Sequence, residues 1–195
     1  MTVMKDEAYI LKTLENLLDK KRLEHSIGVS NTSQQLAARF GAHPHKAKIA
    51  GLVHDCAKGL TRQQMIDAIK RYNLRLDTVT IMEQELIHGP LGAAMAADIF
   101  EIDDLDILNA IRYHTTGRAN MTILEKIVYL SDFIEPSRCY LGVDRLRDLA
   151  FKDLDDAIIK AFSNTIDYVL RLGSLIHPLT IDARNDMLIR RKYNL

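Results

Sequence analysis

Six histidine and aspartate side chains stand out in this sequence because helical spacing places them on or beside apolar segments. They are His25, the adjacent pair His54-Asp55, His88, His114 and Asp132. An ionised carboxylate in an apolar setting is costly unless it is paired or bound to a metal, so both aspartates need partners. Imidazole and carboxylate together suit iron, manganese or zinc better than calcium or magnesium. The pattern therefore predicts a transition-metal centre, in which an aspartate could bridge two ions.

Each of these side chains, taken alone, also has a simpler explanation. His25 could be an ordinary partly buried histidine, and His88 before Gly-Pro could belong to helix-start chemistry. His114 could complement the dipole at a helix C-terminus, and Asp132 could pair with an arginine elsewhere. The adjacent His-Asp pair at the end of an apolar helix is harder to explain in this way. The joint occurrence of all six favours the metal centre.

The elements that must position these residues are helices almost throughout. Helical periodicity, with glycine at helix ends and proline at helix starts, gives a series of predicted helices. They cover 6–19, 21–40, 44–57, 61–72, 78–86, 90–100, 104–114, 121–134, 144–150, 153–172 and 180–192. The segments 73–80, 137–143 and 174–180 are expected to be largely non-helical, and no alternating pattern is long enough to predict a sheet. We expect an all-α fold forming one compact bundle.

The overall composition is that of an ordinary globular protein, with 47% apolar and 27% charged residues among 195. Lys plus Arg and Asp plus Glu both number 26, and the resulting zero formal charge argues against general nucleic-acid or membrane-surface binding. No apolar run approaches the roughly 20 residues that span a bilayer. Two cysteines and no secretory start fit the reducing cytoplasm, where no structural disulfide is needed.

The ordered set His25, His54-Asp55 and Asp132 resembles the H…HD…D signature of the HD superfamily of metal-dependent phosphohydrolases. The strings VHDCAKG, HGPLGA, IRYHTTGR and YLSDFIEPSR are similar, more narrowly, to the bacterial HD-domain symmetric diadenosine-tetraphosphate hydrolases (the YqeK family). The resemblance runs from His25 to about residue 190, without a departure at the metal-ligand positions. It implies a single HD-domain helical bundle over 1–195, with a core at about 20–135 and C-terminal helices over 144–192 packed on it.

The resemblance also implies a reaction and a cofactor. The expected reaction splits diadenosine tetraphosphate at its centre into two ADP, by attack of a metal-activated water on a phosphoanhydride. The expected metal is iron, as one or two ions, with manganese or another divalent transition metal as alternatives. Its ligands would be His25, His54, Asp55 and Asp132. His88 and His114 would either complete a second metal position or contact the substrate phosphates, and the sequence leaves this choice open.

Catalytic and substrate-binding roles follow from the same resemblance. Asp55, His88 and His114 are the expected catalytic residues. The expected substrate contacts are His25, Lys58, His88, His114, Thr115, Thr116, Gly117, Asp132, Arg138, Gly173, Ser174, Leu175, Ile176 and His177.

Several of these contacts are reasonable on physical grounds, although each could be an ordinary surface residue. Lys58 lies about one turn after Asp55 and could reach a phosphate beside the metal. The loop 115–117 offers hydroxyls and backbone N–H groups that can cradle phosphate oxygens. Arg138 carries a planar fork suited to bidentate phosphate contact, and the segment around His177 could pack against a base.

Two other functions share the same motifs. The chain could be an HD phosphohydrolase acting on other nucleotides, or a non-catalytic nucleotide-sensing module. The expected partners are a dinucleoside polyphosphate substrate and an ADP-like or GDP-like product, with neither nucleic acid nor membrane. The sequence leaves a homodimer open.

Overall fold

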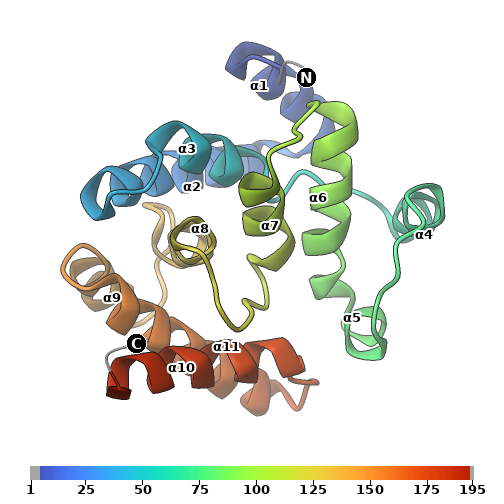
Figure 1. The fold of residues 1–195 in the computed structure, drawn as a ribbon. Helices are drawn as coiled ribbons and strands as arrows, with labels where there is room; N and C mark the ends of the chain where they lie inside the picture. Colours follow the sequence, from blue (N-terminus) through green and yellow to red (C-terminus); the bar gives the residue numbers. More distant parts are fainter. Residues whose placement is uncertain (1–4, 194–195) are drawn as a thin grey trace.

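The computed structural model describes residues 5–193, and the elements in this part of the chain are all helical (Figure 1). The N-terminal half contains α1 (Glu7–Leu17), α2 (Lys20–Phe40), α3 (Pro44–Val53), α4 (Arg62–Arg71), α5 (Thr78–Met82), the short 3-10 helix η1 (Gln84–Leu86) and α6 (His88–Ile99). The C-terminal half contains α7 (Leu105–Tyr113), α8 (Ile123–Ile134), α9 (Val143–Ala150), α10 (Leu154–Leu172) and α11 (Pro178–Tyr193). The predicted all-α fold is confirmed.

Four predicted boundaries are wrong, each for a local reason. The helix expected over 44–57 ends at Val53, because the chain continues in tighter three-residue turns, with Cys56 N–H donating to Val53 O. The segment 73–80 is not loop throughout, because the Asp77 side chain caps α5 from Thr78 onward. The helix expected from Pro90 begins two residues earlier, at the start of α6, and the last helix begins at Pro178 instead of 180.

Helix α8 is the central element of the bundle. It packs against α2, α3, α7, α9 and α10, and Figure 1 shows it nearly end-on with these helices around it. Its sequence ILEKIVYLSDFI is apolar on almost every face, which is the pattern of a helix buried on all sides. Tyr129 is fully buried, with its ring centroid 4.5 Å from that of Phe162 on α10. Asp132 is thus attached to the most enclosed helix of the fold.

Helices α2 and α3 approach each other closely because small residues line their contact. A Cβ atom on Gly51 would lie 2.9 Å from Ser33 Oγ and 3.0 Å from the Ser30 backbone, so no larger residue fits there without a shift. This close approach brings His25 of α2 beside His54 after α3, with ring centroids 5.3 Å apart. The packing of two helices therefore fixes the spacing of two candidate ligands.

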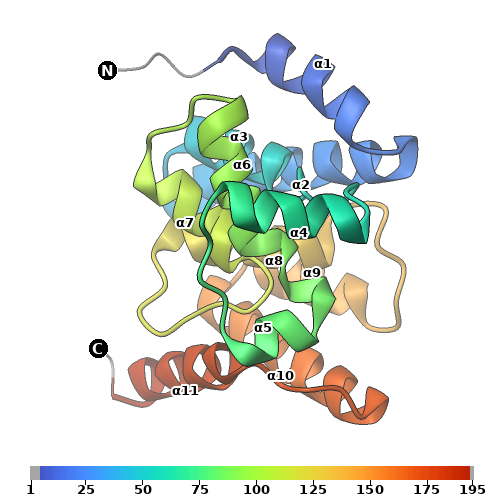
Figure 2. The same ribbon diagram turned by 90° about the vertical axis from the view of Figure 1, so that its right-hand side faces the viewer.

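The C-terminal helices cover the side of α8 away from α1, as the view turned by 90° shows (Figure 2). Helix α10 packs against both α8 and α11, and Gly117 in the loop after α7 lies against its Phe162 side chain. The single domain over 1–195, with a core at about 20–135 and C-terminal helices packed on it, stays a prediction. Within residues 5–193, no helix is long and apolar enough to cross a membrane.

Candidate metal centre

Five separate elements bring the six candidate residues to one place. His25 lies on α2, His54 and Asp55 lie in the turn after α3, and Asp132 lies in the last turn of α8. His88 is the first residue of α6, and His114 directly follows α7. All are buried except Asp132, which is partly exposed. The convergence of residues up to 107 positions apart is the kind of long-range arrangement that no single motif could establish.

The first half of the cluster consists of His25, His54 and Asp132 around one carboxylate oxygen of Asp55. Asp55 Oδ2 lies 3.8 Å from His25 Nε2 and 3.5 Å from His54 Nε2. Asp132 Oδ1 lies 3.0 Å from His25 Nε2 and 4.0 Å from His54 Nε2. Two imidazole nitrogens and two carboxylates thus face a common point, which is a donor set suited to a divalent transition metal.

The second half consists of His88 and His114 around the other carboxylate oxygen of Asp55. Asp55 Oδ1 lies 3.1 Å from His88 Nε2 and 3.6 Å from His114 Nε2. The two Nε2 atoms lie 2.9 Å from each other. Asp55 therefore presents one oxygen to each half and could help to hold an ion on either side.

The histidine rings are oriented for metal binding by acceptors on their far side. His25 Nδ1 lies 3.0 Å from Glu135 Oε1, and the Nδ1 atoms of His54 and His114 each lie 2.7 Å from the backbone carbonyl three residues earlier. These acceptors favour a proton on Nδ1, which leaves Nε2 as the ring nitrogen directed into the cluster. The Nε2 atoms of His25 and His54 are buried without a well-aligned hydrogen-bond partner. Such orphaned acceptors fit a bound cation.

The electrostatics favour the metal-binding charge states of His54, Asp55 and Asp132, whereas for His25 the contacts with Asp132 and Glu135 outweigh burial and raise the pKa. Burial lowers the pKa of His54 to about 4, so its imidazole is neutral near pH 7. Burial alone would raise the pKa of Asp132, but the hydrogen bond from His25 and the nearby positive charges hold it well below its usual range. Asp55 behaves in the same way, because the surrounding histidines outweigh its burial and lower its pKa. Anionic carboxylates beside neutral imidazoles are the metal-binding forms.

The two predicted phosphate-binding cations both lie beside the cluster. Lys58 Nζ lies 3.3 Å from His88 Nδ1 and 2.5 Å from Glu85 Oε2. Arg138 Nη2 lies 2.5 Å from Asp132 Oδ1, and its Nε–H donates to the Asp132 carbonyl. Both side chains are partly exposed, so each could reach a phosphate at the surface of the cluster.

Sequence reasoning missed two charged residues that contact the cluster. Arg22 Nη1 lies 2.8 Å from Asp55 Oδ2. Glu135, whose side chain is 1% exposed, contacts His25. A helical signal existed for both, because Arg22 precedes His25 by three residues and Glu135 follows Asp132 by three, which places each pair on one helix face.

Part of the predicted nucleotide-binding set meets in a cavity of about 210 Å³ beside the second half. Thr115, Thr116 and His177 all line it, although the last lies about sixty residues away along the chain. Asp77 Oδ2 lies 3.0 Å from His177 Nε2 and holds this ring in place. Pro90, two residues after His88, and Thr115, directly after His114, line the same cavity, although none of the six cluster residues does.

The remaining predicted contacts do not reach this cavity. Gly173, with φ of 67°, ends α10 in the left-handed conformation and directs the chain outward, so residues 173–175 are exposed. Ile176 is half-buried and does not line the cavity either. Gly117 has φ of 64°, and a Cβ atom there would lie 2.5 Å from Phe162 Cζ. Its backbone conformation and close packing require glycine independently of any substrate.

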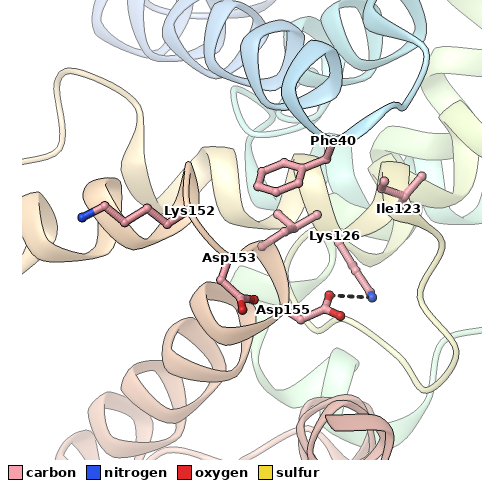
Figure 3. A pocket seen from close by; sticks show the side chains of 7 residues that line it. Phe40, Ile123, Lys126, Lys152, Asp153 and Asp155 are labelled. Atoms are coloured by element: carbon pink, nitrogen blue, oxygen red, sulfur yellow. Dashed lines mark hydrogen bonds and ion pairs between the residues drawn. The ribbon is translucent and has the colours of Figure 1, made fainter. Parts of the chain in front are cut away.

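A larger cavity of about 380 Å³ lies away from the cluster, where the end of α2 meets the starts of α8 and α10 (Figure 3). Phe40 and Ile123 border it, and Lys126 Nζ lies 2.8 Å from Asp155 Oδ1 across its lower part. None of the candidate site residues lines it. The larger of the two cavities therefore does not coincide with the candidate site, which is defined by the convergence of histidine and aspartate side chains.

Comparison with known proteins gives a consistent result. The HD domain family model matches residues 22–137, which include all six cluster residues. A protein named "Bis(5'-nucleosyl)-tetraphosphatase, symmetrical" from Halalkalibacterium halodurans is 40% identical over 182 residues, covering 93% of this chain and 97% of that protein. The protein of the same name from Bacillus subtilis strain 168 is 40% identical over 175 residues, covering 90% and 94%. A crystal structure described as a predicted HD superfamily hydrolase involved in NAD metabolism, from Clostridium acetobutylicum, has a TM-score of 0.92 and 44% identity, covering 96% of this chain and all of that one.

Proposed function

The chain belongs to the HD-domain family, and we propose that it acts there as a symmetrical bis(5'-nucleosyl)-tetraphosphatase that hydrolyses diadenosine tetraphosphate into two ADP. The observation that carries this proposal is the two-sided cluster around Asp55, which lies inside the family region. The names of relatives that share more than 90% of their length with this chain supply the substrate class.

The cluster would hold one or two divalent ions, for which we propose iron, with manganese as an alternative. His25, His54, Asp55 and Asp132 would hold the first. His88 and His114 would either hold a second together with Asp55 or contact the phosphates. When bound, such ions make water acidic enough to act as a nucleophile near neutral pH and neutralise charge on a phosphoryl group.

The side chains around the cluster would bind and orient the tetraphosphate. Hydrolysis of a phosphoanhydride depends mainly on positioning and on charge neutralisation. Lys58 and Arg138 supply partly exposed positive charges at the cluster, each now paired with a carboxylate that a phosphate could replace. Thr115 and Thr116 join the second half to the 210 Å³ cavity, which would take one nucleoside.

The proposed setting is the cytoplasm, where both cysteines would stay reduced. Cys56 is buried and Cys139 exposed, and neither forms a disulfide within the described residues. The products would be ADP or the corresponding diphosphate of another nucleoside, and a homodimer is compatible with the fold.

A substrate panel with the metal-loaded protein tests the proposal. Diadenosine tetraphosphate should be hydrolysed with a kcat/KM at least tenfold above that for deoxynucleoside triphosphates, nucleoside monophosphates and cyclic dinucleotides. Preferential hydrolysis of one of the latter would indicate a different HD phosphohydrolase. Tight ADP binding without turnover of any member would indicate a nucleotide sensor.

A further inference from the structure

Glu135 contacts the Nδ1 side of the His25 imidazole, whereas the Nε2 side of the same ring faces the cluster. We propose that Glu135 is a positioning residue, whose buried carboxylate holds His25 with its proton on Nδ1 and its Nε2 lone pair facing the first half of the cluster. This inference rests on the proposed metal centre. It adds a residue that has no role in the H…HD…D signature.

The carboxylate is fixed from several sides. Its Oε1 lies 3.0 Å from His25 Nδ1, and the side chain is 1% exposed. The Ser137 backbone N–H donates to Oε2 at 2.7 Å, and the Ser137 hydroxyl donates to Oε1. Arg147 donates to the backbone carbonyls of Ile134 and Glu135 and so holds the end of α8. The carboxylate is therefore held with Oε1 facing His25, and Arg138 Nε, 3.8 Å from Oε1, is the other charged group beside it.

Gly28 provides the space that this carboxylate needs. It lies three residues after His25 on the same face of α2, and a Cβ atom there would lie 2.6 Å from Glu135 Oε2. Glycine inside a helix ordinarily destabilises it relative to alanine. Because the atom that an alanine would meet is the end of a flexible side chain, the substitution would displace the carboxylate while leaving the helices in place.

His25 differs from His54 and His114 in the group that contacts its Nδ1 atom. His54 and His114 rest on neutral backbone carbonyls, whereas His25 rests on an ionisable carboxylate. A carboxylate behind a ligating imidazole fixes the tautomer and increases the basicity of the ligating nitrogen. Loss of such a partner typically weakens metal binding by about 10- to 100-fold.

The Glu135→Gln variant tests the role of the charge with the shape conserved. The Ser137 backbone N–H is fixed and needs an oxygen acceptor at the Oε2 position, whereas the Ser137 hydroxyl can rotate to accept a hydrogen bond, so the new amide NH₂ will occupy the Oε1 position and face His25 Nδ1. The amide would then donate to Nδ1 and move the ring proton to Nε2, which cannot bind a metal in that form. We expect Mn²⁺ affinity, measured by electron paramagnetic resonance titration, to fall by about 10- to 100-fold.

The tautomer can be measured without any metal. Long-range ¹H–¹⁵N spectra of the metal-free protein should show a proton on His25 Nδ1 in the wild type and no proton on Nδ1 in Glu135→Gln. Gly28→Ala should weaken Mn²⁺ binding in the same direction, because its methyl group displaces the carboxylate. Glu125→Gln is the matched control: Glu125 is equally buried on α8, but it pairs with Arg118 and does not contact His25.

The outcomes separate this inference from the metal centre itself. Mn²⁺ affinity reduced in Glu135→Gln and Gly28→Ala but not in Glu125→Gln, with the change of His25 tautomer, supports the inference. Wild-type affinity and an unchanged tautomer in Glu135→Gln would overturn it. Failure of the wild type to bind Mn²⁺ would instead contradict the proposed metal centre, and the tautomer spectra would still decide whether Glu135 sets the His25 proton.

Discussion

Replacement of Asp55 by asparagine should remove metal-dependent stabilisation of the whole protein. Asp55 is the one residue of the cluster that presents an oxygen to both halves, with Oδ2 3.5 Å from His54 Nε2 and Oδ1 3.1 Å from His88 Nε2. The amide of asparagine is uncharged, and one of its two positions carries a donor, so it can serve at most one half weakly. Binding at both halves should therefore be lost together.

The size of the expected metal-dependent shift of Tm follows from the linkage between metal binding and folding. One ion that binds only the folded state stabilises it by about 2.7 kcal/mol at a free concentration of 100 times Kd. For a chain of 150–250 residues, 1 kcal/mol shifts Tm by about 2–4 °C, so one ion should raise Tm by roughly 5–11 °C. We expect this shift in the wild type and a shift of about 1 °C or less in Asp55→Asn.

Differential scanning calorimetry over a Mn²⁺ titration measures the effect. His114→Ala should keep most of the shift, because the group His25, His54 and Asp55 remains complete without His114. Asp104→Asn is the control, because Asp104 caps α7 and pairs with Lys46, and asparagine caps helices equally well. A full Mn²⁺-dependent rise of Tm in Asp55→Asn would refute the assignment of Asp55 as the shared ligand.

Three further predictions concern other parts of the molecule. Gly117→Ala should lower the free energy of unfolding by about 2–4 kcal/mol in urea titrations, because the left-handed φ of Gly117 and its contact with Phe162 both exclude a side chain. A loss of less than about 0.5 kcal/mol would contradict this packing. Burial raises the pKa of the Cys56 thiol to about 12. At pH 8 a maleimide should therefore label the native protein once, at Cys139, and the unfolded protein twice. Two labels on the native protein would be inconsistent with the structure. His177→Ala should raise KM for diadenosine tetraphosphate about tenfold, or ~1.4 kcal/mol, with little change in kcat, and an unchanged KM would argue that the 210 Å³ cavity does not take the nucleoside.

Local sequence signals were sufficient for the helices and for the type of fold. The apolar run in 121–134 predicted a helix that begins and ends within two residues of the observed bounds of α8. The boundary error after α3 matters more, because the tighter turns beyond Val53 are what direct Asp55 between the two halves. Periodicity describes regular helices and contains no information on such turns.

The candidate site was predictable as a list of residue types and not as a geometry. The six cluster residues could be selected because polar groups on apolar segments are unusual, but their pairing across Asp55 depends on the packing of five elements. Arg22 and Glu135 were missed because each has an ordinary surface or helix-end explanation in sequence, and only the fold shows them against Asp55 and His25. The segment 173–176 was placed at the site by resemblance, and the structure leaves it outside the cavity.

Hydrolysis of diadenosine tetraphosphate in H₂¹⁸O, with mass analysis of the nucleotides, tests the central claim most directly. Metal-loaded wild-type protein should give ADP as the sole nucleotide product, with one ¹⁸O atom in one of the two ADP molecules formed per turnover. Asp55→Asn should give no product above the metal-free background. Formation of ATP and AMP, or of unlabelled ADP, would contradict symmetrical cleavage by water at this centre.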